Sequence, residues 1–255
     1  MNEYIEKVGS LRNVRNEKGV ILISIATVVY NDVANFEATI LSTLNQSYKN
    51  IEYLIIDGGS TDGTVDLIKK YNDSIDYWIS EPDNGIYDAM NKALKIANGD
   101  FLIFMNSGDS FFSTDALVEV AHNIHDLNAI YYGNAIYLNS LTSEQFQRGG
   151  IFNKYRLAKT NICHQTIFFS KKVYKSVSYN LRYKLFADWA YNMVLFNKHN
   201  YIYLNLNIAY YDTSGVSALK KDRNFENDLK KLILKHLGIE TILYLLYNKI
   251  RNFKK

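Results

Sequence analysis

Three aspartates occupy positions from which a carboxylate could act on a ligand. Asp57 follows the apolar run IEYLII, Asp109 closes the stretch FLIFMNSGD, and Asp188 stands in FADWAYNM. A carboxylate can bind a hard divalent cation, accept hydrogen bonds from a base, or take a proton from a hydroxyl group. The residues around each aspartate favour a different one of these roles.

Asp109 suits a divalent cation. It ends a predicted strand alone, with Asn106 where a second acid could have stood. Mg²⁺ and Mn²⁺ commonly take one or two protein carboxylates and complete their coordination with phosphate oxygens and water. A diphosphate ligand would supply the missing oxygens, and the metal would stabilise charge on a departing phosphate. The alternative is an aspartate that caps a helix beginning near Thr114.

Asp57 begins the stretch DGGSTDGT. Gly58 and Gly59 let the backbone come close to a planar ligand, and the carboxylate could accept from the N–H groups of a base, which predicts a nucleoside pocket. The alternative is a tight strand-to-helix turn capped by Thr61 or Asp62. The stretch is not a phosphate-binding loop, because it lacks the P-loop lysine and the GxGxxG spacing.

Asp188 is predicted near the start of a helix over DWAYNMVLFNKH. It could act as a general base toward an acceptor hydroxyl that a substrate brings within hydrogen-bond distance. The alternative is a capping or first-turn aspartate with no catalytic role. In the segment NICHQTIFF, we expect Cys163 to be a small buried residue and His164 or Gln165 to face the groove.

The elements that must position these residues alternate between strand and helix in the first half. Polar clusters follow four successive predicted strands, so we expect them along one edge of a mainly parallel sheet that helices cover on both faces. The clusters are YND, DGGSTD, EPDNG and NSGD. The second half is less regular, with strands predicted over 129–139, 163–170 and 201–205. We expect one domain over 20–221.

The composition excludes several classes of protein. The chain has 255 residues, 47% of them hydrophobic, and a net charge of only +3, which gives no reason to expect nucleic-acid binding. The single cysteine forms no internal disulfide, and no apolar run reaches the roughly 20 residues of a membrane span. We therefore expect a cytoplasmic protein.

Residues 222–255 form a basic, amphipathic helical tail. Apolar residues recur at helical spacing on one side, with Lys and Arg among them. Such a tail can lie on an anionic membrane surface, here the inner face of the cytoplasmic membrane. The alternative is a helix packed on the domain with a solvated basic face. The sequence leaves both open, and it leaves the oligomeric state open as well.

Four longer stretches carry a resemblance to a known family. They are ISIATVVYNDVANFEATILSTLNQSYKNIEYLIIDGGSTDGT, SEPDNGIYDAMNKALKIANGDFLIFMNSGD, CHQTIFFS and FADWAYNM. Together they resemble family 2 glycosyltransferases with the GT-A fold, especially bacterial enzymes that assemble capsule, exopolysaccharide or O-antigen. The resemblance implies an α/β fold with a Rossmann-like nucleotide-binding half, 20–110, an acceptor-binding half, 111–221, and the helical tail.

The resemblance also implies a nucleotide-sugar site. The end of the first strand would line the nucleotide, and Asp57 would approach its base, although many relatives have a second aspartate where this chain has Gly58. Lys92 would help to neutralise phosphate. The implied nucleotide-sugar-binding residues are Thr27, Val28, Tyr30, Asp57, Asp83, Asn91, Lys92, Asn106, Ser107 and Gly108.

NSGD resembles the family's metal motif. The resemblance implies that Asp109 binds Mg²⁺ or Mn²⁺, and Asn106 and Gly108 replace acids that relatives carry, so the bound diphosphate would complete the site. Asp188 matches the catalytic base, with Ala187 where many relatives have glutamate. The implied acceptor-binding residues are His164, Gln165 and Trp189.

The implied reaction is inverting. Asp188 would take a proton from an acceptor hydroxyl while the nucleoside diphosphate leaves on the opposite face, and no enzyme nucleophile is needed. The donor would be a UDP- or GDP-linked sugar, the acceptor a saccharide or lipid-linked saccharide, and residues 211–217 would close over the site. One alternative is a non-catalytic nucleotide-sugar-binding or scaffold module with a degenerate metal motif. A nucleotidyltransferase is disfavoured, because no glycine-rich basic loop follows the first strand.

Overall fold

The structure is a computed structural model that describes residues 5–8, 19–138, 142, 144–213 and 221–253. Within these residues ten strands form one sheet in the order β1-β4-β3-β2-β5-β9-β7-β10-β6, with β8 paired to β7. The strands are β1 (Ile5–Val8), β2 (Ile23–Val29), β3 (Ile51–Asp57), β4 (Tyr77–Ser80), β5 (Phe101–Phe104), β6 (Ser110–Phe111), β7 (Ile130–Leu138), β8 (Gln145–Arg148), β9 (Ile167–Ser170) and β10 (Tyr201–Asp212).

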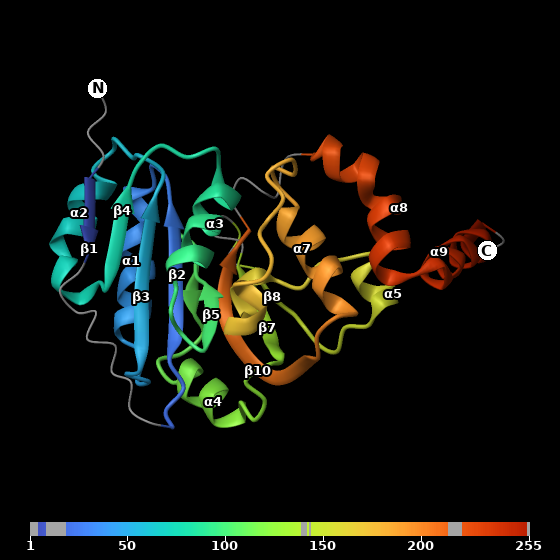
Figure 1. Cartoon of the computed structure of the whole chain (residues 1–255), viewed down its shortest axis with the longest axis horizontal. Coiled ribbons are helices and arrows are strands. Elements are labelled where there is room, and N and C mark those ends of the chain that lie inside the picture. The colour runs from blue at the N-terminus through green and yellow to red at the C-terminus, as the bar shows by residue number, and fades with distance from the viewer. Residues whose placement is uncertain (1–4, 9–18, 139–141, 143, 214–220, 254–255) are drawn as a thin grey trace.

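Helices cover this sheet and extend from one end of it (Figure 1). The α-helices are α1 (Val33–Leu44), α2 (Thr64–Lys70), α3 (Ile86–Ile96), α4 (Ala116–Asn123), α5 (Lys154–Leu157), α6 (Lys171–Tyr174), α7 (Ala187–Phe196), α8 (Arg223–Leu237) and α9 (Ile239–Phe253). Short 3₁₀ turns cover Asn72–Ser74 and His164–Thr166. None of the helices in the described part of the chain is both long and apolar enough to cross a bilayer.

The first half of the sheet is parallel, as predicted. Strands β4, β3, β2 and β5 pair in parallel, and the register places Val29 beside Asp57 and Asp57 beside Ser80. The C-terminal ends of β2, β3 and β4 therefore finish level with one another. Residues 105–107 continue along β2, with Ser107 N donating to Val28 O. The polar clusters thus share one edge, which confirms the predicted placement.

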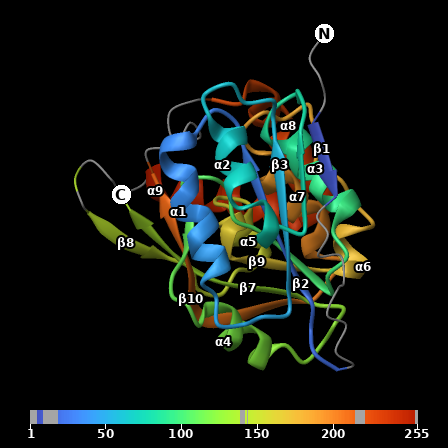
Figure 2. The same ribbon diagram turned by 90° about the vertical axis from the view of Figure 1, so that its left-hand side faces the viewer.

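The second half is mixed. β9 lies antiparallel to both β5 and β7, and β10 runs parallel to β7 with an irregular register between Tyr203 and Ala209. The strand predicted over 163–170 begins only at Ile167, because residues 164–166 turn in a 3₁₀ helix. The antiparallel hairpin of β7 and β8 projects from the body of the molecule (Figure 2).

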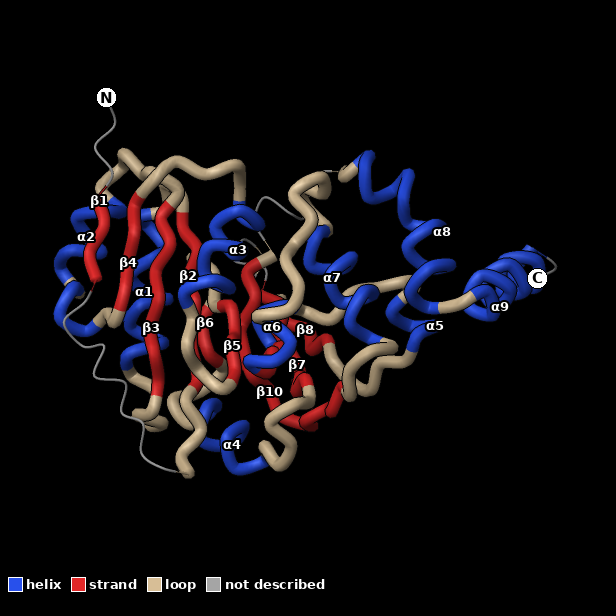
Figure 3. The backbone as a smooth tube through the Cα atoms, viewed as in Figure 1, coloured by secondary structure: helices blue, strands red, loops and turns tan. Residues whose placement is uncertain are grey.

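Buried apolar side chains form one cluster on each face of the sheet. Along β3, Leu54 and Ile56 join one cluster while Tyr53 and Ile55 join the other, because successive strand residues point to opposite faces. Residues of α3, α7 and α8 belong to the first cluster, and residues of α1, α2 and α4 to the second. Figure 3 shows these helices and the strands of the sheet along the backbone. Burial on both faces explains the unbroken apolar runs of the first half.

The two helices of the expected tail have different environments. α8 contributes Phe225, Ile233 and Leu237 to the core, and the Asp222 side chain accepts from Phe225 N and Leu185 N. α9 follows a break at Gly238 and lies at the far end of the molecule, near the C-terminus (Figure 1). The first helix is therefore part of the domain. The question of a membrane-binding tail concerns α9 alone.

Candidate active site

The loops after β2, β3 and β5 are tied together by side-chain hydrogen bonds. Asn31, whose φ is +48°, donates from its backbone N to Ser60 Oγ at 2.8 Å, and its Oδ1 accepts from Thr61 N at 2.9 Å. Ser107 Oγ donates to Asp32 Oδ2 at 2.6 Å. The loops after β2, β3 and β5 are thereby held together at the C-terminal edge of the sheet, and we call them the rim.

Asp57 organises its own turn. Its carboxylate accepts from Gly59 N at 3.1 Å, Ser60 N at 2.9 Å, Ser80 Oγ at 2.5 Å and the Ser60 hydroxyl, and the residue is fully buried. These four bonds use about all the acceptor capacity of a carboxylate. The Asp57 side chain therefore stabilises the strand-to-helix turn. It could bond to a nucleobase only if one of these four hydrogen bonds were broken.

The space around Gly58 is too small for a second aspartate in this turn. A Cβ atom at Gly58 would lie 2.7 Å from Asp83 Oδ2 and 3.2 Å from a ring carbon of Tyr30. The Asp83 side chain, whose Oδ1 accepts from Gly85 N at 2.7 Å, therefore occupies the space that a larger residue at 58 would need.

The remaining predicted nucleotide-binding residues of β2 and α3 divide into two groups. Thr27 and Val28 are buried in the sheet, with Thr27 Oγ1 3.2 Å from the Tyr53 hydroxyl, so only their backbone could meet a ligand. Asn91 is also used internally, because it exchanges hydrogen bonds with the backbone of Tyr179. The prediction from sequence rested on chain position and did not include the direction of each side chain, and for these three residues it remains a prediction.

Two predicted residues do lie at the rim. Tyr30 is 63% exposed beside Gly58. Lys92, on α3, pairs with Glu81 at 2.7 Å, in the EPDNG loop. Both remain predictions as nucleotide contacts.

Asp109 is held in a buried position at the other side of the rim. Its Oδ2 accepts from Gln165 Nε2 at 2.5 Å and its Oδ1 from Asp212 N at 3.1 Å. Burial raises the pKa of Asp109 to about 7, against the opposing effect of the Gln165 hydrogen bond. The helix-cap alternative is not what the structure shows, because α4 begins at Ala116 and its N-cap is Asp115.

The NSGD turn fits a divalent cation that brings further ligands with it. Asp109 is a buried carboxylate that takes part in no ion pair of the described residues, and Asn106 Oδ1 is a buried oxygen without a hydrogen-bond partner there. Buried charges are normally paired or bound to metal. Across the described residues no three His, Cys, Asp or Glu side chains gather, so phosphate oxygens and water would complete the coordination.

Asp188 lies in the first turn of α7 and is held by three side chains. Tyr87 OH donates to its Oδ1 at 2.8 Å, Asn161 Nδ2 donates to its Oδ2 at 2.7 Å, and His164 Nδ1 lies 3.5 Å from the same Oδ2. Only 13% of the side chain is exposed. A carboxylate fixed in this way, with acceptor capacity left on Oδ1, can receive a proton from a bound hydroxyl.

One dipeptide links this carboxylate to the NSGD turn. Asn106 Nδ2 lies 2.8 Å from His164 Nε2, and His164 Nδ1 lies 3.5 Å from Asp188 Oδ2. The neighbouring Gln165 bonds to Asp109. His164 and Gln165 therefore lie between Asp188 and Asp109, each beside one of the two carboxylates.

The side chains of Gln165 and Trp189, predicted to contact the acceptor, have partners within the protein, and the acceptor contacts remain predictions. Gln165 is 1% exposed, and both ends of its amide are used, by Asp109 and by Cys163. Trp189 donates from Nε1 to Leu157 O at 2.7 Å and packs on Phe225 of α8. Adjacent helical residues face different directions, which separates Trp189 from Asp188.

Tyr87 and Asn161 were not predicted from the sequence. Tyr87 lies in the stretch GIYDAMNK, just after a strand-end loop, and that placement was an available signal. Asn161 precedes CHQT in an irregular segment without periodicity, so no signal marks it. The expected closing segment 211–217 is described only as far as Thr213, and residues 214–217 lie outside the described part of the chain.

Substituting Tyr87 by phenylalanine is expected to lower kcat for group transfer about tenfold and to leave nucleotide affinity unchanged. The substitution removes only the hydroxyl, which lies 2.8 Å from Asp188 Oδ1 and 2.7 Å from Leu185 O, so Tyr87 is a positioning residue. The measurement is a separate determination of kcat and of the nucleotide Kd. Tyr183→Phe is the matched control, because Tyr183 donates to Asp228 away from Asp188. Equal kcat for the two variants would contradict the assignment.

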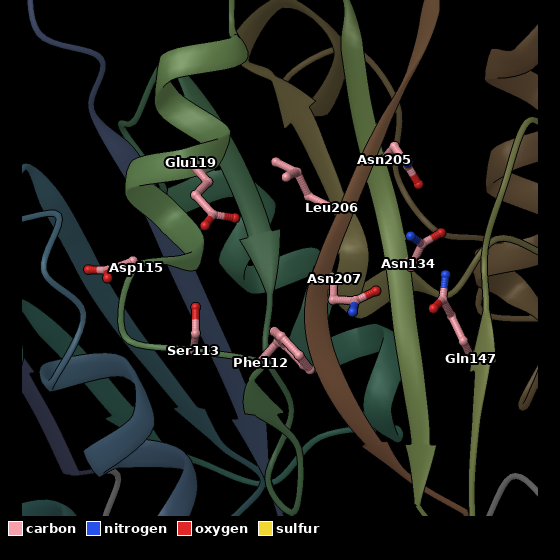
Figure 4. A pocket seen from close by; sticks show the side chains of 9 residues that line it. All are labelled: Phe112, Ser113, Asp115, Glu119, Asn134, Gln147, Asn205, Leu206 and Asn207. Carbon is pink, nitrogen blue, oxygen red and sulfur yellow. The ribbon is translucent and has the colours of Figure 1, made fainter.

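Two cavities adjoin this half of the molecule. The larger, about 520 Å³, lies between α4 and β10 and is lined by Phe112, Ser113, Asp115, Glu119, Asn134, Gln147, Asn205, Leu206 and Asn207 (Figure 4). It opens where β10 departs from regular pairing with β7. The smaller, about 200 Å³, includes Asn161 and Cys163 in its wall and thus touches the surroundings of Asp188.

Residues 24–199 match the model of the family described as glycosyl transferase family 2. A mycobacterial protein named PGL/p-HBAD biosynthesis glycosyltransferase, from Mycobacterium bovis, is 33% identical over 235 residues, which cover 88% of this chain and 89% of that protein. The Escherichia coli protein WfaP, named UDP-Glc:alpha-D-GlcNAc-diphosphoundecaprenol beta-1,3-glucosyltransferase, is 32% identical over 168 residues, 62% of this chain and 64% of that protein.

Solved structures show the same fold at low sequence identity. S. aureus TarS in complex with UDP superposes with a TM-score of 0.65 and 18% identity, over 85% of this chain and 65% of that one. The mannosyltransferase PcManGT from Pyrobaculum calidifontis, in complex with GDP-Man and Mn²⁺, has a TM-score of 0.57 and 14% identity, over 84% of this chain and 61% of that one. This chain is thus shorter than either structural neighbour.

Proposed function

The chain belongs to glycosyl transferase family 2, and we propose that it moves a sugar from a nucleoside diphosphate to an acceptor hydroxyl with inversion, using Asp188 as general base. It is a glycosyltransferase with the GT-A fold, of the kind that builds bacterial cell-surface glycans. The proposed mechanism is supported mainly by one observation. His164 contacts Asp188, and the adjacent Gln165 bonds to Asp109, so the proposed base and the proposed metal ligand belong to one site.

The proposed transfer is a single displacement. The acceptor oxygen attacks the anomeric carbon as its proton passes to Asp188 Oδ1, and the bond from that carbon to the diphosphate oxygen breaks with its electron pair on the diphosphate. Tyr87 and Asn161 hold the carboxylate of Asp188 in one orientation. The activation free energy of transfer therefore does not include the entropy lost in orienting this group. No covalent sugar–enzyme intermediate is formed.

The proposed donor site lies along the rim between Tyr30 and Asp109. The donor would be a UDP- or GDP-linked sugar, since structural neighbours were solved with UDP or with GDP-Man. Lys92, Ser107 and the loop at Asp83 are at this rim and would contact the donor. Mg²⁺ or Mn²⁺, held by Asp109 with Asn106 Oδ1 nearby, would supply positive charge for the leaving diphosphate.

A panel of nucleotide sugars tests the activity directly. The protein is incubated with UDP- and GDP-linked sugars and Mn²⁺, and the release of UDP or GDP is measured with and without saccharide and lipid-linked saccharide acceptors. Acceptor-dependent release with one donor is expected. The alternative, a binding module, predicts nucleotide binding with no release from any donor. The ordered surroundings of Asp188 favour the enzyme, because a module that only binds would not require them.

The exposed side of α9 is the proposed contact with an anionic membrane surface. Four aliphatic side chains lie on one side of this helix, each more than half exposed: Ile239, Leu243, Leu246 and Ile250. Residues 239–255, from the start of α9 to the end of the chain, hold four Lys or Arg against one Asp or Glu. An apolar stripe on a basic segment fits a negatively charged lipid surface.

The double substitution Leu243→Glu with Leu246→Glu is expected to abolish sedimentation with vesicles that contain phosphatidylglycerol. The wild-type chain should sediment with these vesicles at low salt and less at high salt. Leu127→Glu, at another exposed leucine, is the matched control. Truncation should start after Gly238, because removing α8 would open the core. A wild-type dimer that the double substitution dissociates would show instead that a second copy covers the stripe.

A further inference from the structure

The smaller cavity carries two arginines that the proposed mechanism does not use. Arg148 and Arg156 line it together with Tyr137, Thr160, Asn161 and Cys163. Its volume of about 200 Å³ is below the roughly 300–1,000 Å³ of pockets that enclose a whole ligand. The cavity therefore suits one charged part of a larger ligand.

Both guanidinium groups are positioned by aromatic rings. Arg148 lies over the rings of Tyr137 and Phe146, 4.8 and 5.4 Å from their centroids. Arg156 lies 4.1 Å from the centroid of Phe152 and donates to Gly149 O at 2.6 Å and to Ile151 O at 3.0 Å. An arginine held in this way loses little conformational freedom when it binds a ligand, and its remaining N–H groups match the oxygens of a phosphate.

Neither arginine has a carboxylate partner among the described residues, where the ion pairs involve Lys69, Lys70, Lys92, Lys154, His164 and Arg182. Two such cations at one small cavity attract an anion, and two positive charges suit a phosphate better than a single carboxylate. The position of the cavity indicates whether this anion belongs to the donor or to the acceptor.

The cavity shares a wall with the candidate base and belongs to the acceptor side. Asn161 lines it and donates to Asp188 Oδ2 at 2.7 Å. Its lining residues all fall between 133 and 163, and none comes from the donor half. A phosphate bound here would thus belong to the molecule whose hydroxyl reaches Asp188, and the donor diphosphate at Asp109 is a separate group.

The helix that carries Arg156 also contacts α9. Tyr155 packs on Tyr244 of α9 with centroids 4.4 Å apart, and Lys154 forms an ion pair with Glu240. The anion cavity and the helix with the apolar stripe are therefore connected through the four residues of α5. This arrangement fits an acceptor in which a phosphate lies between a sugar and a lipid chain.

We propose that this cavity binds the phosphate of a lipid-linked acceptor, with Arg148 and Arg156 as its ligands, so that the enzyme acts on sugars joined to a lipid through a diphosphate. The inference rests on the proposed function, because it names the acceptor class of the same site. It adds two specificity-determining residues on the acceptor side, both distant from the metal motif in sequence.

The test uses undecyl diphosphate, which carries the proposed anion and a lipid chain but no sugar. Its Kd is measured by titration calorimetry for the wild-type chain, Arg148→Gln, the double variant with Arg156→Gln, and Lys69→Gln as a control for lost charge on exposed α2. We expect about tenfold weaker binding for Arg148→Gln, a larger loss for the double variant and no change for the control. Within the described part of the chain the Arg148 side chain contacts rings and is exposed, so Arg148→Gln is expected to fold.

Competition experiments show whether undecyl diphosphate binds at the proposed cavity or at the donor site. Excess UDP should leave undecyl diphosphate binding intact, and dodecanoate should bind more weakly than the diphosphate. Displacement by UDP would overturn the proposal in favour of the donor site, as would wild-type affinity in the double variant or equal binding of dodecanoate. Acceptor-dependent release of nucleotide in the donor panel is measured separately, so failure of the cavity and failure of the glycosyltransferase mechanism give different results.

Discussion

The Asp188→Asn variant should transfer sugar about 10²- to 10⁴-fold more slowly than the wild-type chain and still bind the nucleotide. The amide keeps the shape of the side chain and can still bond to its neighbours, but it cannot take the proton of the acceptor hydroxyl. Removing a positioned general base costs rates of this order. The measurement is acceptor-dependent release of nucleotide at saturating donor, together with the nucleotide Kd.

Asp66→Asn is the matched control for this variant. Asp66 is an exposed aspartate on α2 whose partner is Lys69, and it takes no part in the site. Its substitution should leave transfer unchanged. If Asp188→Asn were as active as the control, Asp188 would not be the base, and the ordered network around it would need another explanation.

Loss of the Asp109 carboxylate should weaken metal-dependent nucleotide binding on the order of 100-fold. Changes to residues that merely support a metal ligand already cost about 10- to 100-fold in metal affinity. Asp109→Asn retains an oxygen for Gln165 but removes the charge that faces the cation. The readouts are the Kd for Mn²⁺ in the presence of UDP, and the rise in melting temperature that Mn²⁺ with UDP produces, since a ligand that binds only the folded state stabilises it.

Treatment with EDTA gives the complementary result. The wild-type chain should lose transfer activity in EDTA and regain it when Mn²⁺ is added, and Asp109→Asn should respond only weakly to the metal. Asp115→Asn, at an exposed aspartate six residues further along the chain, is the control. Full wild-type activity in EDTA would contradict the proposed metal requirement, but it would not affect the assignment of Asp188 as the base.

The strand-end loops could be predicted because their signal is local. A run of residues buried on both faces must be apolar, and the turn that follows must be polar, so β2, β3 and β5 mark the edge of the sheet in the sequence itself. The turn alternative named Thr61 or Asp62 as the capping residue for the same reason, and the Asp62 carboxylate accepts from the first N–H of both α1 and α2.

The use of each side chain at that edge could not be predicted, because the partners are distant in sequence. Gln165 and Asp109 are 56 residues apart, and Tyr87 and Asp188 are 101 apart. Gly99 shows the same limit. The helix α3 ends at Ile96, three residues before Gly99, and a Cβ atom at Gly99 would lie 2.6 Å from Ser24 N. A close approach between segments requires this glycine.

The bridge formed by His164 and Gln165 has a thermodynamic consequence. Because one dipeptide contacts both carboxylates, a ligand that reorients Gln165 at Asp109 is expected to change the orientation of Asp188 through His164. Coupling free energies between two binding events are reciprocal. Metal–nucleotide binding should then alter acceptor affinity by the same factor by which the acceptor alters nucleotide affinity.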